Sequence, residues 1–132
     1  MNNMTMDEKR EKLTEEYTAI TKQKEARLDE LNAKSRGLEK CLDELNEFRL
    51  NLKSLLSQQR SESLTHGAHE DIEMSDKFEE ELNEGYNPVN KAITDEQEET
   101  ERERKKILTD LEEAEKEYRR KMSTLEQEEP TQ

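Results

Sequence analysis

The sequence predicts an all-α protein: an elongated antiparallel helical hairpin, similar to a coiled coil, that forms one domain over residues 1–132. Two long stretches carry apolar residues at helical spacing, and a short polar segment with a glycine lies between them. Charged residues make up 43% of the chain and hydrophobic residues only 28%, so the chain cannot bury a large globular core. With three glycines and two prolines, few positions favour a helix end.

The first helix is expected from about residue 5 to residue 60. Thr5-Met6-Asp7-Glu8 has the pattern of a capping box, which favours a helix start. A seven-residue repeat places leucines at position a, namely Leu31, Leu38, Leu45 and Leu52. It predicts that position d, occupied by Cys41, Phe48 and Leu55, is the second inward row, where Cys41 would be a small buried side chain. Further leucines at position e widen the stripe enough to contact more than one helix. The stripe comprises Leu31, Leu38, Cys41, Leu42, Leu45, Phe48, Leu52, Leu55 and Leu56.

A loop is expected over residues 61–70, around Gly67, and the second helix from about 71 to 127. Gly85 can cap a helix and Pro88 can start the next one, so we expect a kink or break near 85–88. Residues 126–132 are expected to be a frayed tail. The apolar stripe of this region comprises Phe78, Leu82, Tyr86, Val89, Ile93, Ile107, Leu111 and Tyr118.

Folding the chain near residue 66 places a polar part of the first helix against an acidic part of the second. Lys24, Arg27 and Lys34 occupy a or d positions there, opposite the acidic run 95–103. Opposite charges at these positions can fix the antiparallel register, although exposed pairs add little stability. A solvated middle without specific pairs is the alternative.

The net charge of −13 comes entirely from the second half of the chain, where residues 61–132 carry 23 acidic and 10 basic side chains. Phosphate repulsion argues against nucleic acid or an anionic membrane surface as a ligand. The acidic run 70–84 is either a solvated face or a surface for a basic partner. No stretch is apolar enough to insert into a membrane, and the first residues lack a signal sequence, so we expect a cytoplasmic protein.

The sequence has no recognisable catalytic set, and we expect neither an enzyme nor a cofactor. His66 and His69 lie near Glu70 and Asp71, but two loop histidines without a further fixed ligand are weak evidence for a metal site. Function is therefore sought in what the stripes bind. In a lone hairpin one flank of the 38–56 stripe would stay exposed to water, and a homodimer or a helical client would cover it.

The chain resembles a family of small helical-hairpin proteins that are encoded beside LXG polymorphic toxins in Gram-positive bacteria. The resemblance covers residues 8–127. It is carried by Leu28, Leu31, Leu38, Leu42, Leu45 and Phe48, by Gly67, and by the segments 78–82, 106–111 and 118–120. The small helical proteins of type VII secretion, a broader family, carry a Trp-x-Gly turn and a Tyr-x-x-x-Asp/Glu export signal. Both motifs are absent from this sequence.

The resemblance implies a targeting factor that binds the helical LXG domain of a toxin and helps deliver it to a type VII secretion system, with a second small helical protein as a further partner. All the stripe residues named above are then candidate partner-binding residues. Secretion together with the client, without a cleavable signal peptide, is left open. The alternatives are a self-associating coiled-coil scaffold and, less favoured because the loop is too short for β-hairpins, a prefoldin-like chaperone arm.

Overall fold

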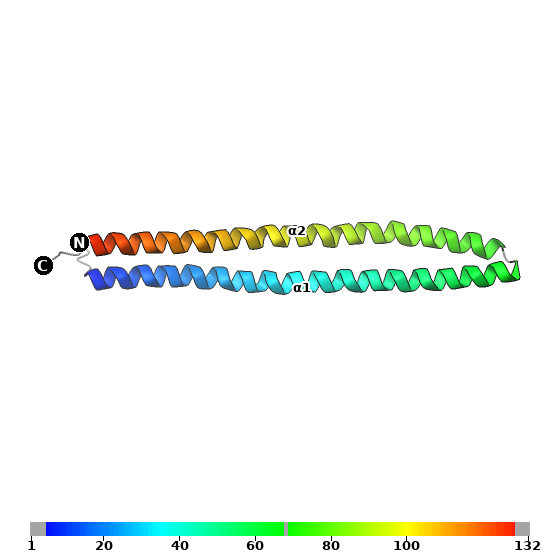
Figure 1. Cartoon of the computed structure of the whole chain (residues 1–132), viewed down its shortest axis with the longest axis horizontal. Coiled ribbons are helices and arrows are strands. Elements are labelled where there is room, and N and C mark those ends of the chain that lie inside the picture. The colour runs from blue at the N-terminus through cyan, green and yellow to red at the C-terminus, as the bar shows by residue number, and fades with distance from the viewer. Residues whose placement is uncertain (1–4, 68, 129–132) are drawn as a thin grey trace. The chain divides into compact units, whose positions relative to one another are not determined.

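The computed structural model, which describes residues 5–67 and 69–128, is an all-α helical hairpin. Helix α1 spans Met6–His66 and α2 spans His69–Glu128 (Figure 1). The described residues divide into two compact units. Among the described residues, unit 1 combines 5–33 with 100–128, and unit 2 comprises 34–67 and 69–99. In each unit the two helices run antiparallel.

The start of α1 follows the capping pattern in the sequence. The Glu8 backbone N–H donates to Thr5 Oγ1 at 3.2 Å, and the acidic side chains of Asp7 and Glu8 lie in the first turn, where they complement the helix dipole. The expected N-terminal cap is confirmed.

The turn between the helices is much shorter than the expected loop over 61–70. Helix α1 continues to His66, and the chain reverses at Gly67, whose φ of 70° lies in the left-handed region that favours glycine. The polar residues before the turn are helical, and the Thr65 hydroxyl donates to the Ser61 carbonyl at 2.9 Å.

The expected break near residues 85–88 is absent. Helix α2 passes through both Gly85 and Pro88, and Gly67 is the only glycine with positive φ among the described residues. Proline in a helix interior removes one hydrogen bond and costs about 3 kcal/mol. Tyr86 offsets part of this cost, because its side chain packs against α1 in the same turn. Helix α2 also extends to Glu128, and residues 129–132 of the expected frayed tail lie outside the described part.

The two units differ in how completely they bury apolar side chains. Unit 1 contains Leu31, which is 0% exposed, and the buried Ile107. The rings of Tyr17 and Tyr118 stack there with centroids 4.5 Å apart. In the described residues of unit 2, the buried side chains are Ser63 and Ser75, and every large apolar side chain keeps some exposure. Unit 2 is therefore the less completely packed of the two.

We predict opposite effects for alanine at two glycines. Gly85→Ala should stabilise the protein by about 0.5–1 kcal/mol, because Gly85 lies inside a helix and an added Cβ would have no neighbour within 4 Å. Gly67→Ala should destabilise it by about 1–2 kcal/mol, because alanine resists positive φ. Urea unfolding followed by circular dichroism measures both. Equal effects would contradict the continuous helix through residue 85.

Candidate partner-binding face

Apart from Lys53, the half-buried residues of α1 in unit 2 recur at alternating spacings of three and four and face α2. The apolar ones and Arg49, together with half-buried residues that face them from α2, form what we call the seam. On α1 the seam comprises Leu38, Leu42, Leu45, Arg49, Leu52 and Leu56, and on α2 it comprises Glu79, Leu82, Tyr86 and Ile93.

The seam corrects the expected heptad register. Cys41, expected to be buried, is exposed, and Phe48 and Leu55 in the same row are 59% and 61% exposed. The second inward row is instead the one expected at position e. Two heptads and one heptad before Cys41, the excluded row carries Arg27 and Lys34, whereas the inward row carries Leu28 and Ser35 at the neighbouring positions. Facing the inward row toward α2 keeps Arg27 and Lys34 from being buried, although it places Arg49 in the seam.

Of the seventeen stripe residues named from the sequence, twelve are occupied by packing within the hairpin. Leu31 and Ile107 are buried in unit 1, where Leu111 and Tyr118 are half-buried. The half-buried members in unit 2 are Leu38, Leu42, Leu45, Leu52, Leu56, Leu82, Tyr86 and Ile93. The five exposed members, all in unit 2, are Cys41, Phe48, Leu55, Phe78 and Val89. These five are the ones that remain accessible to a partner.

One side of the unit 2 seam is closed by polar contacts, and we call it the polar edge. It comprises Asn46, Lys53 and Arg60 on α1 and Asp76, Asn83 and Asn90 on α2, each set spaced by seven residues. The Arg60 guanidinium lies 2.9 Å from the Asp76 carboxylate.

Two further contacts tie the seam to this polar edge. The Arg49 guanidinium lies over the Tyr86 ring, 4.3 Å from its centroid, and donates to Asn83 Oδ1 at 3.4 Å. The Tyr86 hydroxyl donates to Asn46 Oδ1. These contacts join the two helices at this edge.

The opposite side of the same seam is apolar. Cys41, Phe48 and Leu55 recur every seven residues on α1, and Phe78, Gly85 and Ala92 do so on α2. All six are exposed, and we call them the apolar edge. An open groove of about 320 Å³ at this edge is lined by Leu56, Gln59, Met74 and Phe78, whereas a separate groove at the polar edge is lined by Lys53, Arg60 and Asp76. Phe78 lines only the first of these two grooves, and Arg60 and Asp76 line only the second. Phe78 therefore lies on the opposite side of the seam from the Arg60–Asp76 pair.

Sequence reasoning missed Gly85, Ala92 and Met74 as parts of this face. The sequence predicts a helix end at Gly85, and Ala92 adds too little apolar area to be recognised as part of the stripe. Gly85 and Ala92 lie seven and fourteen residues after Phe78, but this repeat is meaningful only if the helix continues through Pro88. The incorrect break therefore concealed two of the six residues of the apolar edge.

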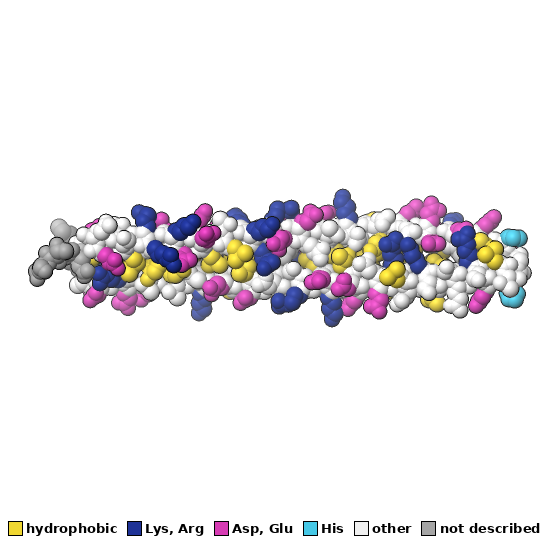
Figure 2. Space-filling view, in the orientation of Figure 1, with side chains coloured by type: hydrophobic (Ala, Val, Ile, Leu, Met, Phe, Trp, Pro, Cys, Tyr) yellow, Lys and Arg dark blue, Asp and Glu magenta, His cyan; other side chains and the backbone are white. Residues whose placement is uncertain are grey.

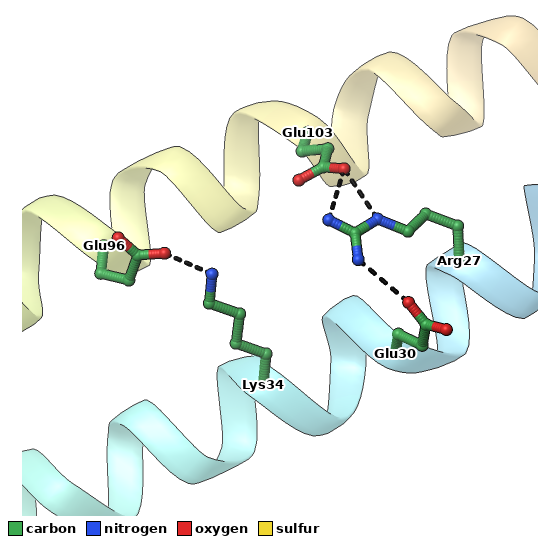
Figure 3. Close-up of polar contacts among 5 residues, drawn as sticks. All are labelled: Arg27, Glu30, Lys34, Glu96 and Glu103. Atoms are coloured by element: carbon green, nitrogen blue, oxygen red, sulfur yellow. Dashed lines mark hydrogen bonds and ion pairs between the residues drawn. The ribbon is translucent and has the colours of Figure 1, made fainter.

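Cross-helix ion pairs lie on either side of the boundary between the units, as expected from the charges. In unit 1 the Arg27 guanidinium donates to Glu103 at 2.8 Å and to Glu30 at 3.0 Å, and in unit 2 the Lys34 ammonium bonds to Glu96 (Figure 3). The hydrogen bond to Glu103 is the main cause that raises the pKa of Arg27. The expected pairing with the acidic run 95–103 is confirmed for Arg27 and Lys34, whereas Lys24 pairs with Asp110, outside that run, at 3.3 Å.

Charged side chains lie beside and between the apolar side chains along the helices in the view of Figure 2.

In unit 1 the hydrogen bond from Arg120 lowers the pKa of Glu117 below its ordinary value. This pair therefore contributes stability above the ordinary carboxyl pKa, and the contribution is lost as the pH falls through the lowered pKa. Because both groups are exposed, the effect on stability is small.

Among the described residues, no group of three or more His, Cys, Asp or Glu side chains could hold a metal ion. His66 and His69 are exposed at the turn. None of the described helices is both long and apolar enough to cross a membrane. Comparison with protein-family models, curated proteins and solved structures found no match to this chain.

The seam register predicts different costs for two neighbouring substitutions. Leu45→Asp should destabilise the protein by about 2–4 kcal/mol, because it places a charge between the helices. Phe48→Asp should change stability by less than about 1 kcal/mol, because Phe48 is largely exposed. Urea unfolding measures both variants. The opposite ranking would restore the register in which Phe48 faces inward.

The Arg27–Glu103 pair makes a separate prediction. Arg27→Glu should lower the melting temperature, since the new carboxylate would face Glu103 and adjoin Glu30. The double variant with Glu103→Arg should recover most of the loss, measured by thermal circular dichroism at low salt. If the double variant melts lower than Arg27→Glu alone, the two residues do not contact each other in solution.

Proposed function

We propose that this chain is a non-enzymatic binding partner for a helical protein client. The client that we propose is the N-terminal LXG domain of a secreted toxin, which the chain would help deliver to a type VII secretion system. The helical nature of the client is supported by the geometry of the apolar edge. The LXG domain is supported by the sequence resemblance over residues 8–127.

The observation that carries the proposal is the exposure of large apolar side chains on one side of unit 2. Phe48 and Leu55 keep about three fifths of their surface exposed, and Phe78 keeps 49%. Covering each of them would contribute about 1–2 kcal/mol. Phe48 and Leu55 repeat along α1 and Phe78 lies in the facing row of α2, so these side chains gather on one side of unit 2 rather than occurring singly. Grouped exposed apolar side chains mark protein interaction sites.

The spacing of the apolar edge favours a helix as the occupant. Residues seven apart on a helix lie roughly 10 Å apart along its axis, which is also the repeat of a partner helix in a coiled coil. A third helix lying along the edge could place its side chains between Phe48 and Leu55 on one side and beside Phe78 on the other. The open groove at Leu56, Gln59, Met74 and Phe78 begins such a path.

We predict that Phe48→Asp prevents copurification of the chain with a helical client. The buried carboxylate would lack a partner, so the affinity should fall by about 100-fold or more. Leu50→Asp is the matched control. Leu50 is 66% exposed on the same helix, but it lies roughly 200° around the axis from Phe48 and therefore outside the apolar edge.

The measurement is coexpression with the LXG domain of a neighbouring toxin gene, followed by affinity purification and calorimetric titration. Melting curves of both variants establish that each remains folded. Wild-type affinity for Phe48→Asp, or equal losses for the two variants, would contradict binding at this face. Loss of binding for Phe48→Asp alone supports it.

A further inference from the structure

We propose that the apolar edge of unit 2 accepts one amphipathic helix whose apolar stripe is flanked by lysine and arginine side chains. This inference rests on the proposed function and specifies the chemistry of the client surface. Two features of the edge support it. One is the charge of the residues that border the edge, and the other is the small size of its α2 side chains.

The positions three residues after each residue of the apolar edge include acidic side chains and no basic one. Glu44 and Glu81 lie three residues after Cys41 and Phe78, on the outer side of each helix, and Asp95 lies three residues after Ala92. Glu62 and Asp71 continue the two edge rows toward the turn. All five side chains are exposed. A helix lying on this edge would therefore have carboxylates along both of its flanks.

Basic residues offset this border only in part. Lys77 and Lys91 lie four residues before Glu81 and Asp95 on α2, and all four side chains are exposed. Lys34 continues the α1 row beyond Cys41, but its ammonium group is bonded to Glu96. Lys40 lies 4.0 Å from Glu44, and both side chains are well exposed, so this pair neutralises the border only weakly. Residues 34–99 as a whole carry 17 acidic and 8 basic side chains. The field at the edge favours a basic partner.

The α2 side of the edge provides room for large side chains of the partner. Gly85 and Ala92 follow Phe78 in the same row, opposite the larger Phe48 and Cys41 of α1. A Cβ placed at Gly85 would have no neighbour within 4 Å, so the space above it is open. The occupant can therefore seat leucine-sized or larger residues over Gly85 and beside Phe48.

A second copy of this chain is a poorer occupant. Two apolar edges facing each other would bring two acidic borders together, and like charges across an interface oppose association. A homodimer is therefore treated as an outcome of the test. A chain that dimerises through Phe48 would overturn the proposal.

The test uses the full chain and two synthetic amphipathic peptides of about three heptads, each with leucine at a and d and one tryptophan. One peptide has lysine at the flanking positions, and the other has glutamate. Because the chain contains no tryptophan, the fluorescence reports the peptide alone. The lysine peptide should bind, with a shift of its emission to shorter wavelength, and its affinity should fall by about tenfold or more between low and high salt. The glutamate peptide should bind at least about tenfold more weakly at low salt.

Three variants localise the binding. Gly85→Leu should abolish binding of the lysine peptide while leaving the hairpin folded, because leucine fills the open space and favours a helix. Glu44→Lys combined with Glu81→Lys should reverse the preference between the two peptides. Leu50→Asp should bind like the wild type. Unchanged binding by Gly85→Leu would overturn the assigned position.

The outcomes separate this inference from the proposed function. If both peptides bind equally and Phe48→Asp abolishes binding of both, the face binds helices, but the charge preference is overturned. If neither peptide binds while the LXG client still requires Phe48, the proposed function stands and this inference fails. If sedimentation equilibrium shows a dimer that Phe48→Asp dissociates, the edge is occupied by a second copy.

Discussion

The structure depends on a geometric constraint: two packed helices can bury only two rows of a heptad from each partner. Helix α1 in unit 2 offers three apolar rows, so one of them must be left outside. The row left outside is the one that also carries Arg27 and Lys34, although the inward row holds a cation of its own, Arg49. Arg27 and Lys34 pair with carboxylates of α2 from partly exposed positions. These ion pairs therefore lie in the same row as the face that is available for binding.

Much of the fold could be predicted from periodicity. The number of helices, the cap at Thr5 and the reversal at Gly67 follow from local signals in the sequence. The local signals at Gly85 and Pro88 were misleading, because a helix packed along another can tolerate one missing hydrogen bond and one flexible residue. Propensity describes a single turn, whereas packing acts along the whole helix.

The candidate face was predictable only in part. The width of the stripe showed that some apolar surface would stay exposed. The sequence pattern alone does not determine which two of the positions a, d and e pack against the partner helix. Position e of the sequence register, with Leu42 and Leu56, proved to be inside, and position d, with Phe48, proved to be outside. On α2, the predicted break separated Phe78 from Ala92. Both errors concern the relation between distant parts of the helices, which local patterns do not encode.

Pro88 has a consequence for the motions of α2. Proline lacks an N–H group, so the carbonyl of Glu84 lacks its usual donor four residues later, directly before the flexible Gly85. The backbone around residues 84–88 should consequently open more readily than the rest of the helix, and its amide hydrogens should exchange with solvent sooner. Since this segment includes the middle of the apolar edge, a helix bound there would slow the same exchange. The rate of amide hydrogen exchange at residues 84–88 would then indicate whether a helix is bound at this face.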